Sequence, residues 1–208
     1  MVQAALVAGL KPVEVLVDAE RPPELPGLDW AEQVDPKLLE EVSALGHPPR
    51  VLAIFRNADL PRLHPETAPP VGLGLWRVGD PGNIGTLLRT ADGLGPAFVT
   101  LSAGSADVTG PKALRASAGA VFRVPVGLFD ESPAPKIALV AHGGTSLPEL
   151  DLGERATFVL GAEREGLPDD VIGACDAVAT IPLAPGAESL NVAVSGALAL
   201  YEWRRRHR

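Results

Sequence analysis

The chain has 208 residues, 46% of them hydrophobic, and carries a formal net charge of −8. That length and apolar content predict an ordinary folded core, and the acidic balance argues against a protein that coats nucleic acid non-specifically. The single cysteine, Cys175, excludes an intramolecular disulfide, and the four scattered histidines form no pattern of metal ligands, so we expect no bound metal.

The first sixty residues predict a small βαβ-like unit, which is short for an independent core. Its expected elements are a helix within 1–10 that ends at Gly9, a strand at 13–17, a helix at 36–44 with Asp35 as N-cap, and a strand at 50–55. The proline-rich segment 61–70 is typical of a linker. We therefore expect three parts: a small domain at 1–60, the linker at 61–70 and a larger domain at 71–208.

The larger part alternates strand and helix patterns in a regular way. Strands are expected at 71–76, 98–101, 121–126, 136–141, 157–160 and 177–181, and helices at 86–94, 112–119, near Pro168 and at 190–203. Such an alternation predicts an α/β fold with a mainly parallel sheet that is covered on both faces.

The last expected helix has an unusually wide apolar band, which indicates burial or a place in a subunit interface. Ser189 stands where its N-cap belongs. Lys112, Arg115 and Arg123, together with the basic tail WRRRHR at 203–208, are candidates for a local nucleic-acid patch. The alternative for the tail is a set of arginines that complement the dipole at the helix C-terminus.

No stretch approaches the roughly 18 apolar residues of a membrane-spanning helix, and the N-terminal sequence lacks the basic region of a signal peptide. We expect a soluble, cytoplasmic protein with no membrane partner.

Three turns that contain polar residues each follow an expected strand. They are DPGNIGTLLRTADGLG at 80–95, FVLGAEREGLP at 158–168 and IPLAPGAESLNVAVSGALALYE at 181–202. In an open α/β sheet, turns at the carboxyl ends of strands converge on one crevice. These three turns therefore predict a single site.

In this order and with these separations, the three segments closely resemble the signature motifs of the SpoU, or TrmH-like, family of RNA ribose 2′-O-methyltransferases in the SPOUT superfamily. One motif alone is weak evidence, whereas all three in order are specific. The resemblance covers 71–201 and includes KALRASAGAVFRVPV at 112–126. The first sixty residues resemble a shortened form of the small substrate-binding domain that many members carry.

The resemblance implies a parallel α/β sheet with a deep C-terminal trefoil knot, and a homodimer in which the partner completes each site. It also implies S-adenosylmethionine as cofactor, bound in the knot. The residues implied to hold it are Ala141, Gly161, Ile181, Leu183 and Leu190.

The same resemblance implies five polar site residues, which are Asn83, Arg89, Glu163, Ser189 and Asn191. Methyl transfer to a ribose hydroxyl needs positioning, a dry pocket and help in losing the hydroxyl proton. Because a guanidinium stays charged, Arg89 suits a phosphate clamp better than a base. Alternative interpretations are a surface arginine for Arg89, a solvated loop charge for Glu163 and a helix N-cap for Asn83.

The expected function is S-adenosylmethionine-dependent 2′-O-methylation of ribosomal or transfer RNA. The competing hypothesis is a noncatalytic RNA- or ligand-binding protein that kept the knotted fold. The acidic net charge and the shortened N-terminal domain favour this hypothesis. A methyltransferase that confers antibiotic resistance uses the same chemistry, and the sequence does not separate it from a housekeeping enzyme.

Overall fold

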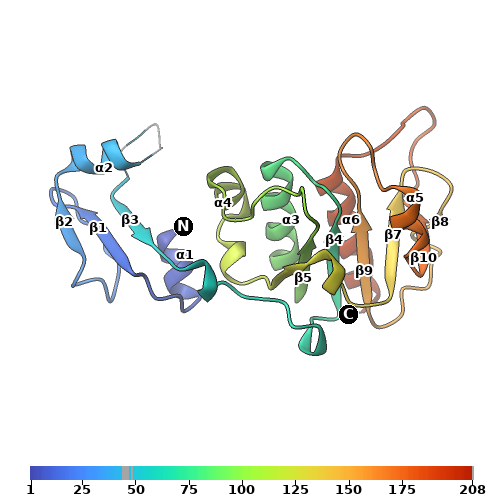
Figure 1. The fold of residues 1–208 in the computed structure, drawn as a ribbon, viewed down its shortest axis with the longest axis horizontal. Helices are drawn as coiled ribbons and strands as arrows, with labels where there is room; N and C mark the ends of the chain where they lie inside the picture. The colour runs from blue at the N-terminus through green and yellow to red at the C-terminus, as the bar shows by residue number, and fades with distance from the viewer. Residues whose placement is uncertain (44–46, 48, 208) are drawn as a thin grey trace. The chain divides into compact units, whose positions relative to one another are not determined.

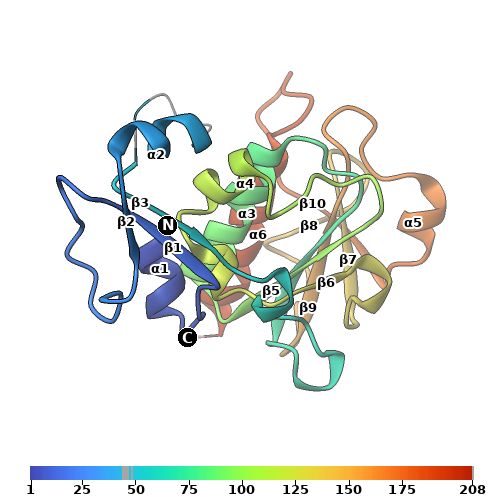
Figure 2. The same cartoon turned by 60° about the vertical axis from the view of Figure 1, so that its left-hand side comes forward.

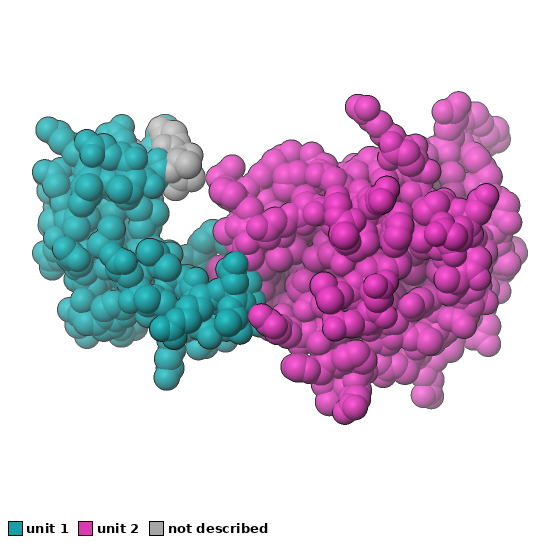
Figure 3. Space-filling model, viewed as in Figure 1, with its two compact units in different colours: residues 1–60 teal, residues 61–208 magenta. Residues whose placement is uncertain are grey.

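The structure, a computed structural model, describes residues 1–43, 47 and 49–207. The chain divides into two compact units, Met1–Leu60 and Pro61–Arg208 (Figure 3). Along the described chain, no helix combines the length and the apolar character that crossing a membrane requires.

The N-terminal unit is built on a three-stranded sheet with the order β2-β1-β3. Its elements are α1 (Val2–Val7), β1 (Glu14–Asp18), β2 (Glu32–Val34), α2 (Pro36–Val42), β3 (Val51–Ile54) and the 3₁₀ turn η1 (Asn57–Asp59). Strand β1 pairs parallel with β2 and antiparallel with β3, so the prediction of a βαβ-like unit is wrong. Its core contains Val15, Val17 and Leu28.

Helix α2 begins as expected, because the Asp35 carboxylate accepts a hydrogen bond from the Lys37 backbone N–H at 2.8 Å. The helix ends at Val42. Its predicted end at Ala44 lies outside the described residues.

The C-terminal unit contains a seven-stranded sheet with the order β6-β5-β4-β9-β7-β10-β8, in which every strand pair is parallel (Figure 1). The strands are β4 (Val71–Leu75), β5 (Ala97–Leu101), β6 (Val126–Leu128), β7 (Lys136–Val140), β8 (Thr145–Ser146), β9 (Ala156–Leu160) and β10 (Ala177–Thr180). This confirms the predicted α/β fold with a mainly parallel sheet. The trefoil knot stays a prediction.

The helices of this unit are α3 (Pro81–Leu94), α4 (Pro111–Ser117), α5 (Asp169–Gly173) and α6 (Val192–Arg206), with 3₁₀ turns η2 (Pro65–Thr67), η3 (Ala120–Phe122) and η4 (Phe129–Glu131). Helix α3 packs against both α4 and α6, as Figures 1 and 2 show. The contact with α6 is close, because a Cβ added at Gly196 would lie 2.4 Å from Leu87 Cδ2. Helix α6 also contacts β4 and β9.

Two local predictions need correction. The expected strand at 121–126 is instead η3 followed by β6, since Ala118 and Gly119 both adopt left-handed backbone and turn the chain before Ala120. The segment 61–70, expected to be a linker, contains η2, and its Leu63 and Ala68 are buried in a cluster with Phe98.

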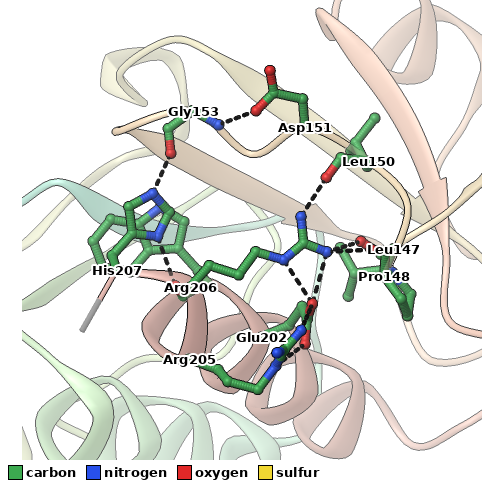
Figure 4. A network of polar contacts seen from close by, with 10 residues as sticks. Leu147, Pro148, Leu150, Asp151, Gly153, Glu202, Arg205, Arg206 and His207 are labelled. Atoms are coloured by element: carbon green, nitrogen blue, oxygen red, sulfur yellow. Dashed lines mark hydrogen bonds and ion pairs between the residues drawn. The ribbon is translucent and has the colours of Figure 1, made fainter.

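Three arginines of the basic tail, Arg204, Arg205 and Arg206, are paired within the C-terminal unit. Arg206 donates hydrogen bonds to the carbonyl oxygens of Leu147, Pro148 and Leu150 and contacts Glu202 (Figure 4). Arg204 donates to the carbonyl oxygens of Leu94 and Gly95. These contacts fasten the end of α6 to the loop after β8 and to the end of α3, so neither guanidinium is free to form a patch for an acidic ligand.

Candidate functional site

The three predicted turns lie at the carboxyl ends of strands. The predicted segment 80–95 begins after the short loop that follows β4, and most of it is helix α3. The turn at 161–168 follows the neighbouring strand β9, and the turn at 181–191 follows β10. A cavity of about 530 Å³ is lined by the second and third turns and by the end of β7, with residues within 139–141, 160–166 and 181–195. The first turn does not line the cavity, and it joins the other two through hydrogen bonds to Glu163 and Asn191.

All five residues expected to hold the cofactor line this cavity, and they are Ala141, Gly161, Ile181, Leu183 and Leu190. Three of the five expected polar residues also line it, and they are Glu163, Ser189 and Asn191. Asn83 is not among the lining residues, yet its side chain contacts two of them. Arg89 is also not among the lining residues.

The turn after β9 is a tight hairpin that presents Glu163. Ala162 and Gly166 exchange backbone hydrogen bonds of 3.1 and 3.0 Å. A Cβ added at Gly161 would lie 2.1 Å from the backbone carbon of Gly166, and Gly166 has a φ of +68°. Both glycines are therefore needed for this turn.

The Glu163 carboxylate joins the turn after β9 to the turn after β4. It accepts hydrogen bonds from the backbone N–H groups of Gly79 and Asp80, each at 3.1 Å, and from Asn83 Nδ2 at 2.9 Å. Partial desolvation acts to raise the pKa of Glu163, but the hydrogen bonds from Asn83 and the backbone outweigh it and hold the pKa below its ordinary value. The Glu163 carboxylate is therefore ionised at neutral pH and is held in place by its hydrogen bonds.

Asn83 extends the same chain of contacts to the third turn. Its Oδ1 accepts a hydrogen bond from Asn191 Nδ2 at 3.1 Å. The Asn191 Oδ1 in turn accepts from the backbone N–H groups of Ala193 and Val194, at 2.8 and 3.3 Å. We call the three side chains Glu163, Asn83 and Asn191 the carboxylate–amide chain. It ties the three predicted motifs together.

The two helix starts at the site differ from the sequence expectations. Asn191, not Ser189, is the N-cap of α6. Asp80 is the N-cap of α3, which begins five residues earlier than the expected Thr86, so Asn83 lies inside the first turn of the helix and its side chain is free to bond across to Asn191. The N-cap interpretation of Asn83 is wrong.

Asp80 is a site residue that the sequence reasoning missed. Its carboxylate caps α3 and forms an ion pair with Lys112 Nζ at 2.8 Å. The hydrogen bond from Lys112, followed by those from the backbone of Asn83 and Gly82, lowers the pKa of Asp80. The signal was available, because Asp followed by Pro is typical of an N-cap and first helical position.

Arg89 lies on the exposed side of α3, six positions after Asn83. Within residues 1–43, 47 and 49–207, its guanidinium makes no hydrogen bond and no ion pair. The structure of one chain therefore does not bring Arg89 to the cavity. Over the same residues, no group of three or more His, Cys, Asp or Glu side chains is arranged to hold a metal ion.

Comparison with known families gives one match over most of the C-terminal unit. Residues 70–201 match the model of the SpoU rRNA Methylase family. The chain belongs to this family. The match spans all three turns, every member of the carboxylate–amide chain and all residues that line the cavity of this SpoU family member.

Relatives of this SpoU chain are methyltransferases by name. An uncharacterized tRNA/rRNA methyltransferase of Synechocystis is 34% identical over 182 residues, covering 83% of this chain and 66% of the relative. The 23S rRNA (adenosine(1067)-2′-O)-methyltransferase of Streptomyces laurentii is 35% identical over 137 residues, covering 61% of this chain and 51% of the relative. The chain thus spans half to two thirds of these relatives.

Solved structures share the fold over nearly the whole chain. The SpoU methyltransferase AviRb from Streptomyces viridochromogenes, in complex with the cofactor AdoMet, has a TM-score of 0.79 at 26% identity and covers 99% of this chain and 87% of its own. A TrmH-family RNA methyltransferase structure from Porphyromonas gingivalis has a TM-score of 0.81 at 33% identity, covering 98% and 86%.

Proposed function

We propose that this protein transfers a methyl group from S-adenosylmethionine to a ribose 2′-hydroxyl of ribosomal or transfer RNA. The observation that carries the proposal is the carboxylate–amide chain at the rim of the cavity, in a member of a family whose named relatives include 2′-O-methyltransferases. Such an activity agrees with the cytoplasmic location expected from the sequence.

The cavity has the chemistry that S-adenosylmethionine needs. Its volume of about 530 Å³ lies in the range of small-molecule cofactor sites. Ile181, Leu183 and Leu190 supply an apolar wall, and Gly161 exposes backbone without a side chain. We assign these residues, together with Ala141, to cofactor binding. The cofactor supplies an activated methyl group on a sulfonium ion, so the protein has to provide position and exclusion of water.

The polar residues orient the ribose. Asn191 and Ser189 lie in the cavity lining, where their side chains suit contact with ribose hydroxyl groups. Glu163 holds Asn83, and Asn83 holds Asn191, so the amide that faces the cavity has a defined orientation. In this proposal Asn83 and Glu163 are positioning residues, because they act through Asn191.

Arg89 is assigned to the site of a partner subunit. Its exposed guanidinium has no contact with its own cavity, whereas a permanently charged group suits clamping of an RNA phosphate and stabilisation of a developing alkoxide. We therefore propose a homodimer in which each subunit lends Arg89 to the other. A noncatalytic protein would not need Arg89 of one subunit at the cavity of the other.

Helix α6 offers the surface for that homodimer. Val194, Leu198 and Tyr201 recur at a spacing of four and three residues on one side of the helix, and their exposed fractions are 47, 40 and 52%. An apolar stripe of this kind, on a helix whose opposite side is buried, favours an isologous contact between two copies.

The N-terminal unit has an acidic composition, with five basic and ten acidic side chains in residues 1–60. RNA phosphates repel such a unit unless a local basic face compensates. We propose that it is a small substrate-binding-like domain that contributes shape rather than charge, and that most RNA affinity comes from 61–208.

Calorimetric titration of S-adenosylmethionine and S-adenosylhomocysteine tests the cofactor assignment, with the mass in solution recorded alongside. We expect micromolar binding at one molecule per subunit of a dimer. Transfer of a labelled methyl group to unmodified 23S rRNA and tRNA transcripts then tests the reaction, and nuclease digestion identifies a 2′-O-methylated nucleoside. Cofactor binding with no transfer to either RNA class would favour the noncatalytic protein.

A further inference from the structure

Arg77 adopts a backbone conformation that non-glycine residues seldom have. It follows β4 and has a φ of 50°, and among the described residues only Ala118, with a φ of 49°, is another non-glycine residue with positive φ. In this left-handed region the Cβ crowds the backbone, so glycine or asparagine is favoured and a long side chain is strained. An arginine in this strained conformation therefore indicates a role for its side chain.

The loop after β5 holds Arg77 in this conformation. The Arg77 backbone N–H donates to Ser102 Oγ at 2.8 Å. The flanking residues are fastened to the same loop, because the Ser102 N–H donates to the Leu75 carbonyl at 3.0 Å and the Ala106 N–H donates to the Val78 carbonyl at 2.9 Å. The backbone is thus determined by its neighbours, and it does not depend on the Arg77 side chain.

The Arg77 side chain contacts an aromatic ring, but among the described residues it has no ionic partner. Its guanidinium carbon lies 5.8 Å from the ring centroid of Trp76, within the range of a cation–π contact. The Trp76 ring is itself supported edge-on by Phe129, at a centroid distance of 5.1 Å. Across the described chain, no hydrogen bond or ion pair involves the exposed guanidinium.

Two other arginines of the C-terminal unit, Arg123 and Arg206, are paired within the chain. Arg123 forms a two-pronged contact with Asp92, and Arg206 is bonded to Glu202 and to three carbonyl oxygens. Arg77 instead lies over an aromatic ring and is exposed. A guanidinium in a cation–π contact keeps the N–H donors that match a phosphate group.

The position of Arg77 is fixed relative to the carboxylate–amide chain. It lies two residues before Gly79, whose N–H binds Glu163 at 3.1 Å. We propose that Arg77, placed over Trp76, binds a backbone phosphate of the RNA substrate beside the target ribose and so sets its register in the site. This inference rests on the proposed function. It gives a reason for an arginine where glycine would relieve the strain.

Three variants test the inference: Arg77→Gly, Arg77→Lys and, as matched control, Ala118→Gly. Both glycine variants relieve a left-handed non-glycine residue, but only the first removes a charge. For Arg77→Gly we expect an unchanged or higher melting temperature and an unchanged Kd for S-adenosylmethionine. Its KM for an unmodified 23S rRNA transcript should rise roughly tenfold or more, as loss of a charge-assisted contact predicts.

The salt dependence of RNA binding separates a phosphate contact from a structural effect. The slope of log K against log salt should fall by about 0.7 to 1 in Arg77→Gly, while Arg77→Lys should keep the slope and recover part of the KM. Ala118→Gly should leave KM and slope unchanged.

If the wild-type protein is active and Arg77→Gly has the same KM and the same salt slope, the role of Arg77 is overturned and the proposed function stands. Absence of methyl transfer by the wild-type protein to every RNA tested would overturn both. A fall in kcat with KM and salt slope unchanged would also reject the phosphate contact.

Discussion

Asn191 Nδ2 donates a hydrogen bond of 3.1 Å to Asn83 Oδ1, a residue 108 positions earlier in the chain. Each of the two amides also makes a second contact, since Asn83 Nδ2 donates to Glu163 and Asn191 Oδ1 caps α6. The directions of these bonds are mutually consistent, because each amide uses its nitrogen as donor and its oxygen as acceptor. Local folding of the α6 start and alignment of the three turns therefore depend on the same side chain.

Replacement of Asn191 by Asp separates the helix cap from the contact with Asn83. An Asp carboxylate still accepts from the α6 backbone and is favourable at a helix N-terminus, but it cannot donate to Asn83. We expect Asn191→Asp to retain stability and lose most methyl transfer. Asn191→Ala should lose transfer, bind S-adenosylmethionine more weakly and be destabilised by about 1 kcal/mol. Thermal melts and transfer assays check both, and a fully active Asn191→Asp would remove the donor from the mechanism.

The sequence predicted the large sheet well, because its strands are short apolar runs that recur between helix patterns. Strand β8 of this sheet and strand β2 of the N-terminal sheet were missed, since two and three residues are too few for a periodic signal. The position of β9 between β4 and β7 was not predictable either. Strand order depends on pairing between distant segments, which local pattern does not encode.

The motifs predicted which residues surround the cavity, but not how their side chains bond. Ser189 and Asn191 are both good N-caps by residue type, so only the backbone geometry decides between them. The link from Asn83 to Asn191 requires α3 to begin at Pro81, earlier than the apolar pattern indicated. Arg89 stays apart from the cavity in one chain, and its role therefore remains a proposal.

Acid should weaken the fold partly through Glu163. Its pKa is lower in the folded protein than its ordinary value, so the stabilisation it provides is complete above that ordinary value and is lost as pH falls through the folded pKa. We expect Glu163→Gln to flatten the fall in unfolding free energy below about pH 5. Urea melts from pH 7 to pH 3 measure this. Glu165→Gln, in the same turn, should follow the wild-type curve, and identical curves for both variants would contradict the prediction.

Substitution of Gly161 by Ala should disrupt the turn that presents Glu163. The added Cβ would meet the Gly166 backbone at 2.1 Å, which a side-chain rotation cannot relieve. We expect a loss of about 1–3 kcal/mol in unfolding free energy and a weaker Kd for S-adenosylmethionine. Gly173→Ala is the matched control, because a Cβ there has no atom within 4 Å. If Gly161→Ala has the stability and the Kd of the wild-type protein, the turn can move to accommodate the added Cβ, which contradicts the prediction.

Leu198→Lys tests the proposed dimer surface on α6. A lysine in the middle of an apolar contact must lose its hydration on association, so we expect monomers in sedimentation at concentrations where the wild-type protein is dimeric. The control is Leu128→Lys, which changes another exposed leucine, 67% exposed compared with 40% for Leu198. The control should stay dimeric. A dimeric Leu198→Lys variant would show that the dimer interface does not include Leu198.

Arg89→Ala should abolish methyl transfer and leave the Kd for S-adenosylmethionine nearly unchanged, because Arg89 does not line the cavity. If Arg89 serves the partner's site, a heterodimer of Arg89→Ala and Asn191→Ala, purified through two different tags, has one site with an intact Asn191 and an intact Arg89. We expect about half of the wild-type activity from it, and none from either variant alone. A dimer made only of Arg89→Ala subunits, carrying the same two tags, is the control. An inactive mixed heterodimer would instead assign Arg89 to the site of its own chain.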